Sequence, residues 1–327
     1  LPEGRYRSVC SVLDRAFQRD EVHMNGVTDQ KHCKALLQES LSGGSNRVRC
    51  LLCPHRCEID EGSLGRCRVR QNIEGVLYAF SYGAVSSLAL DPIEKKPFAQ
   101  FHPGSFILSA GSFGCNLGCK FCQNHEISQH SVPDPDSGLF GMLSPDELVF
   151  RALSLKDRGN IGVAYTYNEP FVNYEFMLET AQLVRTADML NAVVTNGYVS
   201  TDALEGILPF IDAVNIDLKA FSDSFYRYVC GGSLAPVQHS IAFIAEHYPR
   251  CHMEITTLFI PGLNSSENEI KEIARWLSTF SPEIPLHLTR HHPAWKMTSP
   301  EPIEPYELNM LAQTAREFLR NVYVGNV

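Results

Sequence analysis

From residue 105 onward, short apolar runs alternate with longer segments of helical periodicity, and this alternation constrains the fold more than any other feature. Two of the helical segments begin with capping boxes, Ser144–Glu147 and Ser266–Glu269. Strands that are joined through helices run parallel and are connected by right-handed crossovers. The expected strands are 106–110, 162–166, 192–195, 213–218, 253–260 and 286–289, and the expected helices are 144–158, 171–190, 202–210, 237–248, 266–280 and 306–319.

Six strand–helix units predict an α/β fold that is a partial, open (β/α)6 barrel, because a closed TIM-like barrel needs eight units. The strands are apolar throughout, as expected when both faces of a parallel sheet are covered. We expect residues 1–46 to be a helical extension, with helices at 9–17 and 33–41 and a linker at 42–46. Residues 47–104 would form a cysteine-rich module with a β-hairpin region, 75–90, and residues 105–327 the barrel.

Three cysteines follow the first expected strand with the spacing C-x3-C-x2-C: Cys115, Cys119 and Cys122. Three thiolates can hold three irons of a 4Fe–4S cluster, and the fourth iron is then open to a small molecule. A disulfide would use two of the cysteines and leave one over, and a zinc site would need a fourth ligand such as His125. We favour the cluster because the surrounding residues support it independently.

A second cysteine group has the spacing C-x2-C-x3-C-x9-C and lies upstream of the barrel. Four thiolates can bind a structural zinc ion, or they can bind an auxiliary iron–sulfur cluster that passes electrons to the main one. The sequence does not separate these two sites, because both take four thiolates, and four thiols without a metal are a third alternative. The group consists of Cys50, Cys53, Cys57 and Cys67.

Charge, apolar run length and cysteine grouping exclude several classes of protein. The net charge of −9 and the pI near 5.7 argue against nucleic acid as a partner. No apolar run approaches the length of a membrane span. Seven of the 11 cysteines fall in the two groups, which is typical of metal ligands rather than of a disulfide framework. We expect a cytoplasmic protein, although a chain that begins without Met leaves room for a removed targeting peptide.

The residues around the first cysteine motif resemble a known family. The stretches are 91–98, 101–105, 108–111, 114–117 and 121–124. Together they resemble the radical S-adenosylmethionine (radical SAM) enzymes of the branch related to pyruvate formate-lyase activating enzymes. The chain is most similar to the radical enzyme of the AmmeMemoRadiSam system, from about Cys50 to the C-terminus. Stretch 91–98 is either a solvated charge run or part of the substrate mouth.

The resemblance implies a 4Fe–4S cluster that reductively cleaves S-adenosylmethionine to a 5′-deoxyadenosyl radical, which abstracts hydrogen from an unidentified substrate. It implies a flavodoxin- or ferredoxin-type electron donor, and Memo-like and Ammecr-like proteins as partners. One alternative is a glycyl-radical enzyme activase acting on a partner protein, although residues 123–143 lack the cysteine insert of many activases. An alternative of another class is a non-catalytic metal-binding scaffold.

Two expected strands end in residues that suit the cofactor. Asn168 and Glu169 follow the second strand, where the family usually has Gly-Gly-Glu-Pro, and Glu169 would accept hydrogen bonds from the ammonium group of S-adenosylmethionine. A plain carboxylate at a helix N-terminus is the alternative. Thr195 and Asn196 end the third strand and would bind ribose or carboxylate, or would only form a turn.

The fourth strand carries Asp217 and Lys219 on one face, because alternate side chains of a strand point the same way. Charged groups that face a barrel interior need partners. The two residues would bind a polar part of the cofactor, or they would pair with each other at the rim. The sequence identifies no residue that acts on the substrate.

Overall fold

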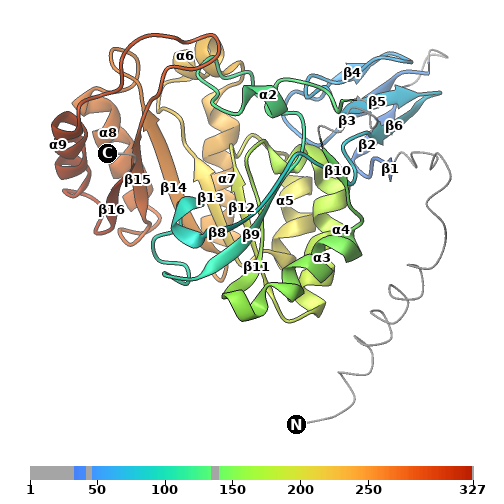
Figure 1. The fold of residues 1–327 in the computed structure, drawn as a ribbon. Coiled ribbons are helices and arrows are strands. Elements are labelled where there is room, and N and C mark those ends of the chain that lie inside the picture. The colour runs from blue at the N-terminus through green and yellow to red at the C-terminus, as the bar shows by residue number, and fades with distance from the viewer. Residues whose placement is uncertain (1–32, 42–45, 134–139, 326–327) are drawn as a thin grey trace. The chain divides into compact units, whose positions relative to one another are not determined.

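The computed structural model describes residues 33–41, 46–133 and 140–325 (Figure 1). An eight-stranded sheet of order β16-β15-β14-β13-β12-β11-β9-β8 forms its centre. Every neighbouring pair from β9 to β16 is parallel, and β8 runs antiparallel to β9 at one edge. The strands are β8 (Ser87–Pro92), β9 (Phe106–Gly111), β11 (Asn160–Tyr165), β12 (Leu190–Thr195), β13 (Ala213–Asp217), β14 (His252–Phe259), β15 (Leu286–Arg290) and β16 (Val322–Gly325).

The predicted partial barrel is confirmed. The six expected strands correspond to β9 and to β11 through β15, each within about two residues of its expected bounds. Strand β16 and the antiparallel edge strand β8 were not predicted as members of this sheet. With β8 and β16 at its two edges the sheet stays open rather than closing on itself.

Helices cover the outer face of the sheet (Figure 1). The capping box predicted at Ser144 is present and starts α3, but Ser266 caps only the amide of Glu269, whose carboxylate accepts from the amide of Phe221 instead. Helix α4 ends earlier than expected because β12 already begins at Leu190. The main helices are α3 (Pro145–Ser154), α4 (Tyr174–Thr186), α5 (Thr201–Ile207), α7 (Leu234–His247), α8 (Glu267–Ser278) and α9 (Pro305–Ala315).

Short helical turns connect these elements. They are η1 (Ile93–Lys95), α2 (His125–Ser128), η3 (Lys156–Arg158), η4 (Pro170–Asn173), η5 (Leu208–Phe210), α6 (Asp223–Phe225) and the π-helical turn η6 (Tyr226–Cys230).

Within the described part of the chain, no helix is both long and apolar enough to cross a membrane.

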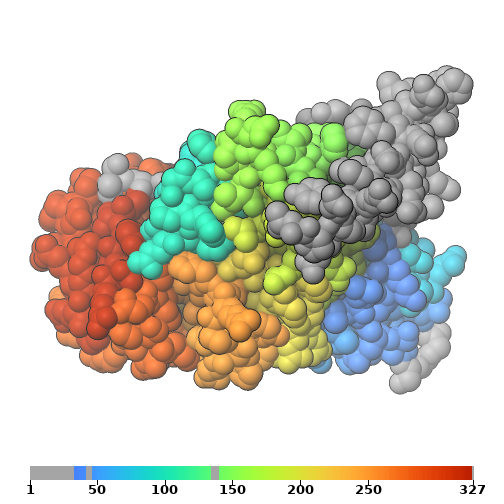
Figure 2. Space-filling view, turned by 90° about the horizontal axis from the view of Figure 1, so that it is seen from below, coloured from blue at the N-terminus to red at the C-terminus, as the bar shows by residue number. Residues whose placement is uncertain are grey.

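The described part of the chain also contains three small antiparallel sheets outside the eight-stranded one. One has the order β1-β6-β5, a second has the order β2-β3-β4, and β7 pairs with β10. In Figure 2 the first two of these sheets, in blue to cyan, lie at the opposite end of the described residues from α9, in red. Their strands are β1 (Cys33–Lys34), β2 (Gln38–Ser40), β3 (Val48–Cys50), β4 (Glu58–Ile59), β5 (Arg70–Ile73), β6 (Val76–Ala79), β7 (Ala84–Val85) and β10 (Gly141–Met142).

The helix predicted at 33–41 is wrong, because this segment forms β1 and β2. Charge pairs across the strands explain the preference for a sheet. Arg49 on β3 lies opposite Glu39 on β2 and Glu58 on β4, and it forms ion pairs with both. The β-hairpin expected within 75–90 is also wrong, because its strands pair elsewhere: β6 pairs with β1 and β5, β7 with β10 and β8 with β9. The helix predicted at 9–17 lies outside the described residues.

The segment between β8 and β9 runs through the barrel interior. Phe98 is fully buried and packs in one cluster with Ala164, Ala192 and Ala213. These three alanines are in register on β11, β12 and β13, so they form a row of small side chains that makes room for the phenyl ring. The backbone of the segment is fixed by the buried Glu254, whose carboxylate accepts from the amides of residues 99 and 100 at 2.9 Å. The segment therefore fills the interior beneath the strand ends.

Candidate active site

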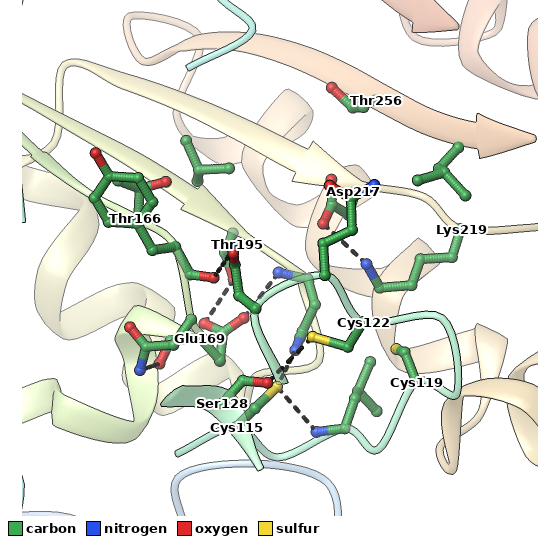
Figure 3. A pocket seen from close by; sticks show the side chains of 18 of the residues that line it. Cys115, Cys119, Cys122, Ser128, Thr166, Glu169, Thr195, Asp217, Lys219 and Thr256 are labelled. Carbon is green, nitrogen blue, oxygen red and sulfur yellow. Dashed lines mark hydrogen bonds and ion pairs between the residues drawn. The ribbon is translucent and has the colours of Figure 1, made fainter. Parts of the chain in front are cut away.

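A cavity of about 340 Å³ lies at the carboxyl ends of the parallel strands (Figure 3). Residues at the ends of β11 to β15 line it, so one mouth collects side chains from most of the sheet. Every residue predicted for the main site lines this cavity. These residues are Cys115, Cys119, Cys122, Asn168, Glu169, Thr195, Asn196, Asp217 and Lys219.

The cysteine loop leaves β9 through Gly114, whose φ of +81° favours glycine. A Cβ at this position would also lie 2.5 Å from the carbonyl oxygen of Cys67. Asn168 holds the loop from the other side. Its side-chain amide donates to the carbonyls of Phe113 (3.1 Å) and Gly114 (2.9 Å), and its Oδ1 accepts from the amide of Ser112 at 3.0 Å. The hydrogen bonds of Asn168 thus go to the loop, although the residue lines the cavity.

The three thiols of the loop differ in their surroundings. Burial raises the pKa of Cys115 well above its usual value. Burial also raises the pKa of Cys122, against the opposing effect of the Ser128 hydroxyl at 3.2 Å. The pKa of Cys119 is lowered, chiefly by a hydrogen bond with the thiol of Cys230. Since a coordinated thiol is deprotonated by its metal, binding of iron to this loop is coupled to the release of protons.

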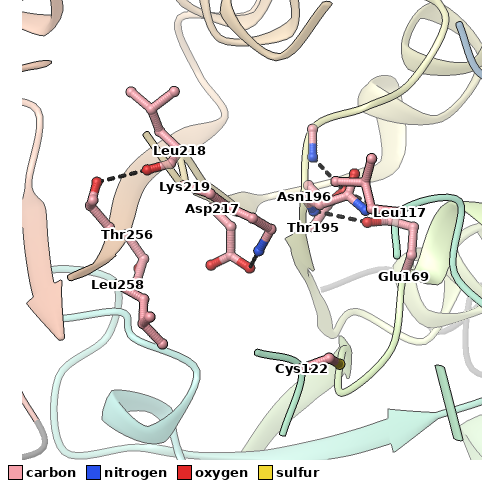
Figure 4. A network of polar contacts seen from close by, with 12 residues as sticks. Leu117, Cys122, Glu169, Thr195, Asn196, Asp217, Leu218, Lys219, Thr256 and Leu258 are labelled. Atoms are coloured by element: carbon pink, nitrogen blue, oxygen red, sulfur yellow. Dashed lines mark hydrogen bonds and ion pairs between the residues drawn. The ribbon is translucent and has the colours of Figure 1, made fainter. Parts of the chain in front are cut away.

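Glu169 is a buried carboxylate at the end of β11, only 1% exposed. Its Oε1 accepts from the hydroxyl of Thr195 (2.8 Å) and the amide of Phe171 (3.1 Å), and its Oε2 accepts from the amide of Asn196 (2.8 Å; Figure 4). Burial nevertheless raises the pKa of Glu169 to about 7. A cationic group in the cavity would favour the ionised carboxylate, so the position suits an ammonium group.

Asn196 connects the end of β12 to the cysteine loop. Its Nδ2 donates to Oδ1 of Asn116 at 2.8 Å and lies 3.6 Å from Sγ of Cys115. Its Oδ1 accepts from the amide of Tyr198 at 2.8 Å, which fixes the orientation of the side chain. Hydrogen bonds to cysteine sulfurs tune the potential of iron–sulfur centres, so Asn196 is placed to influence whatever Cys115 binds.

Asp217 and Lys219 pair at the end of β13, where Nζ lies 2.9 Å from Oδ2 (Figure 4). Burial by itself lowers the pKa of Lys219, but Asp217 and Cys119 outweigh it and hold this pKa well above its usual value. Ile216 and Leu218 are buried, as the predicted alternation requires. Asp217 and Lys219 pair with each other, as one interpretation expected, and they also line the cavity. Their binding of the cofactor stays a prediction.

Sequence reasoning missed Cys230, which lies outside both cysteine groups. Cys230 ends the π-helical turn η6, and its carbonyl accepts from the amide of Gly118 at 2.8 Å. Its thiol forms a hydrogen bond with the thiol of Cys119. No spacing rule connects two cysteines so far apart in the chain, so only the fold reveals this neighbour.

The stretch 91–98 contributes a further polar network. Lys96 is 4% exposed; its Nζ lies 2.8 Å from Oδ2 of Asp91 and 4.2 Å from the ring centre of Tyr167. The Tyr167 hydroxyl donates to Asp91 at 2.7 Å. Lys95 and Lys96 both line the cavity. Of the two interpretations of this stretch, the structure favours the one that places it at the mouth.

The second cysteine group is brought together around β3, β4 and the turn before β5. All four cysteines are free of disulfides, and their thiols are close enough to perturb one another electrostatically. Within residues 33–41, 46–133 and 140–325, no three or more His, Cys, Asp or Glu side chains are arranged as a ready single-ion site. Which metal the group of Cys50, Cys53, Cys57 and Cys67 binds therefore stays a prediction.

Comparisons with known proteins agree with this geometry. The model of the radical SAM superfamily matches residues 111–277. An uncharacterised protein of Methanocaldococcus jannaschii is 40% identical over 300 residues, which cover 90% of this chain and 85% of that protein. The isethionate sulfite-lyase activating enzyme of Oleidesulfovibrio alaskensis is 29% identical over 129 residues, 39% of this chain and 42% of the relative. A solved domain of a pyruvate-formate lyase-activating enzyme from Bacteroides vulgatus is 20% identical, with a TM-score of 0.44, and the match covers 50% of this chain and 99% of the domain.

Three thiols at the mouth of a barrel are typical of a site whose cofactor binds through sulfur. The chain belongs to the radical SAM superfamily, whose members use a 4Fe–4S cluster and S-adenosylmethionine. The predicted superfamily is thus confirmed, with relatives among activating enzymes, and the alternative of a non-catalytic scaffold is set aside. The residues of the cavity fit both cofactors, because sulfur donors, a buried carboxylate and an ammonium group face the same space.

Proposed function

We propose that this protein reductively cleaves S-adenosylmethionine in the cavity and that the resulting 5′-deoxyadenosyl radical abstracts hydrogen from a substrate. The observation that carries this proposal is the convergence of three thiols, the Glu169 carboxylate and the Asp217–Lys219 pair on one cavity. Cys115, Cys119 and Cys122 would hold the 4Fe–4S cluster. When bound, the cluster supplies the electron for the cleavage.

The protein's own side chains bind and orient in this proposal. Glu169 accepts a hydrogen bond from the ammonium group of S-adenosylmethionine, and the hydroxyl of Thr195 keeps its carboxylate in place. Lys219 offers a cation to the carboxylate of the same ligand, with Asp217 fixing its position. Asn168 and Asn196 hold the cysteine loop against the ends of β11 and β12. Preorganisation of this kind limits where a reactive radical is formed.

For the particular branch, we infer the radical enzyme of the AmmeMemoRadiSam system, with Memo-like and Ammecr-like proteins as partners and a flavodoxin- or ferredoxin-type electron donor. The position of the stretch 91–98 supports this, because its Lys95 and Lys96 line the cavity rather than a distant surface. The test is co-purification of the full chain with the two partner types at physiological salt.

A second candidate is a glycyl-radical enzyme activase, which acts on the backbone of a partner protein. The similarity to an isethionate sulfite-lyase activating enzyme favours it. The lack of cysteines in residues 123–143 argues against it. A glycyl-radical signal in a candidate partner after incubation with the reduced enzyme would support this alternative over the first.

The cleavage itself is tested with a variant in which Cys115, Cys119 and Cys122 are all changed to alanine. The protein is reconstituted anaerobically with iron and sulfide, reduced with dithionite and given S-adenosylmethionine. We expect the wild type to form 5′-deoxyadenosine and the triple variant to form none. The matched control is Cys251→Ala, a buried cysteine outside the cavity. Cleavage that persists in the triple variant would reject the proposal.

A further inference from the structure

We propose that Cys50, Cys53, Cys57 and Cys67 hold an iron–sulfur cluster that relays electrons to the centre at Cys115, Cys119 and Cys122. This inference rests on the proposed function, since a relay needs an acceptor. It gives the second cysteine group a role in the reaction rather than in the fold alone. Three features of the structure carry it: the convergence of the four thiols, a buried cation beside them and direct contacts between the two cysteine loops.

The four cysteines lie close together although the first and the last are 17 positions apart in the chain. The amide of Cys50 donates to the carbonyl of Cys57 at 2.9 Å, which closes the loop between them. Within this loop the amide of Arg56 donates to the carbonyl of Cys53 at 3.0 Å, and the φ of Arg56 is +43°. Such a tight turn directs the flanking side chains toward one another, as loops that ligate metals do.

A buried guanidinium lies beside these thiols. Arg70 is fully buried and pairs with Glu175 at 2.5 Å, and its Nε donates to the carbonyl of Val172 at 3.2 Å. Its Nη1 has no hydrogen-bond partner. Cys50 and Cys67 lie within electrostatic range of the Arg70 guanidinium group. A four-thiolate centre is anionic, so it would supply the negative charge that the unpartnered end of Arg70 lacks.

The two cysteine loops touch each other directly. Nε2 of His55, between Cys53 and Cys57, lies 2.8 Å from the carbonyl oxygen of Asn116, the residue after Cys115. A Cβ on Gly114, the residue before Cys115, would lie 2.5 Å from the carbonyl oxygen of Cys67. One hydrogen bond and one close backbone approach therefore connect the ligand loops on both sides of Cys115.

The burial of the cysteines gives the relay a direction. Cys53 and Cys57 are partly exposed, whereas Cys50 and Cys67 are buried. Of the four, Cys67 is the one whose carbonyl oxygen lies close to Gly114. An external one-electron donor protein would reduce the second cluster from its exposed side. One electron then passes to the main cluster, the second cluster returns to its oxidised state, and no atom or proton is transferred. A purely structural zinc ion would stabilise the same turns, but it has no need of contact with the main loop.

The first test measures metal content after anaerobic reconstitution of the full chain. We expect about eight irons and eight sulfides per wild-type chain, and about four of each in both Cys53→Ser/Cys57→Ser and the Cys115/Cys119/Cys122 triple alanine variant. The triple variant should keep a reducible iron–sulfur signal in electron paramagnetic resonance. About four irons and one zinc in the wild type, with the zinc lost in the double variant, would overturn the relay while leaving the proposed function intact.

The second test compares two sources of electrons. Dithionite is small enough to reduce the main cluster directly, so Cys53→Ser/Cys57→Ser should still form 5′-deoxyadenosine with dithionite. With a reduced flavodoxin as the donor, the same variant should lose most of its activity. Cys251→Ser is the matched control and should behave as wild type with both donors. Equal activity of wild type and double variant with flavodoxin would refute the relay, and so would loss with both donors in a double variant that retains four irons at the main site.

Discussion

The pKa of Glu169, raised to about 7 by burial, predicts that the affinity for S-adenosylmethionine rises with pH. The ionised carboxylate attracts the ammonium group of the ligand and the protonated one does not. At pH 6 about a tenth of the chains carry an ionised Glu169, and at pH 8 about nine tenths do, for a pKa of about 7. If only the ionised form binds, the dissociation constant falls about tenfold over this range, or about 1.4 kcal/mol.

The assay is equilibrium binding of S-adenosylmethionine to the oxidised holoenzyme at pH 6, 7 and 8, for the wild type and Glu169→Gln. The amino group of the ligand itself titrates near this range, so only the difference between the two proteins reports Glu169. We expect the wild type to gain about tenfold more affinity between pH 6 and pH 8 than the glutamine variant. Parallel pH profiles for the two proteins would refute the assignment of Glu169 as the ammonium acceptor.

Three further changes probe the scaffold. Burial raises the pKa of Glu254, but hydrogen bonds from His252, His287 and backbone amides outweigh it and lower this pKa to about 2. The stability that the ionised Glu254 contributes is therefore present above pH 4.5 and is lost as the pH falls toward 2. Glu254→Gln should therefore cost about 3 kcal/mol in urea unfolding at pH 7 and less at pH 3, and an equal loss at both would contradict this. Gly114→Ala should lower the Tm and the iron content more than Gly104→Ala, which has the same φ but no neighbour within 4 Å. Phe98→Ala should cost about 3–5 kcal/mol by leaving a cavity, and a smaller loss would mean that the segment collapses into the space.

The barrel was predictable because each of the six predicted parallel strands contains a short apolar run and the segments between them show helical periodicity. Strand β16 gave no such signal because it is only four residues long, Val322–Gly325. The sequence predicted a helix where β1 and β2 lie, because two short strands in succession place apolar residues at irregular intervals that resemble a helical period. Their pairing partners belong to other segments, since β1 pairs with β6 and β2 pairs with β3.

The site was predictable to the extent that its residues stand at strand ends. Cys115, Glu169, Asn196 and Asp217 all do, and topology alone brings such residues to one edge of a parallel sheet. Contacts that depend on the packing of distant loops were not predictable. The thiol of Cys230 beside the main loop belongs to this second kind.

The segment between β8 and β9 lines the cavity without being one of the parallel strands of the sheet, so it can affect the depth of the cavity independently of them. Its Lys95, Lys96 and Pro97 line the cavity, while Phe98 rests on the alanine row of the strands. Because this part of the cavity lining is a loop and not a strand, substitutions in it can change the depth of the cavity without disturbing the hydrogen bonds between the parallel strands. Relatives that act on molecules of different size would then be expected to differ in this insert while sharing the same strands.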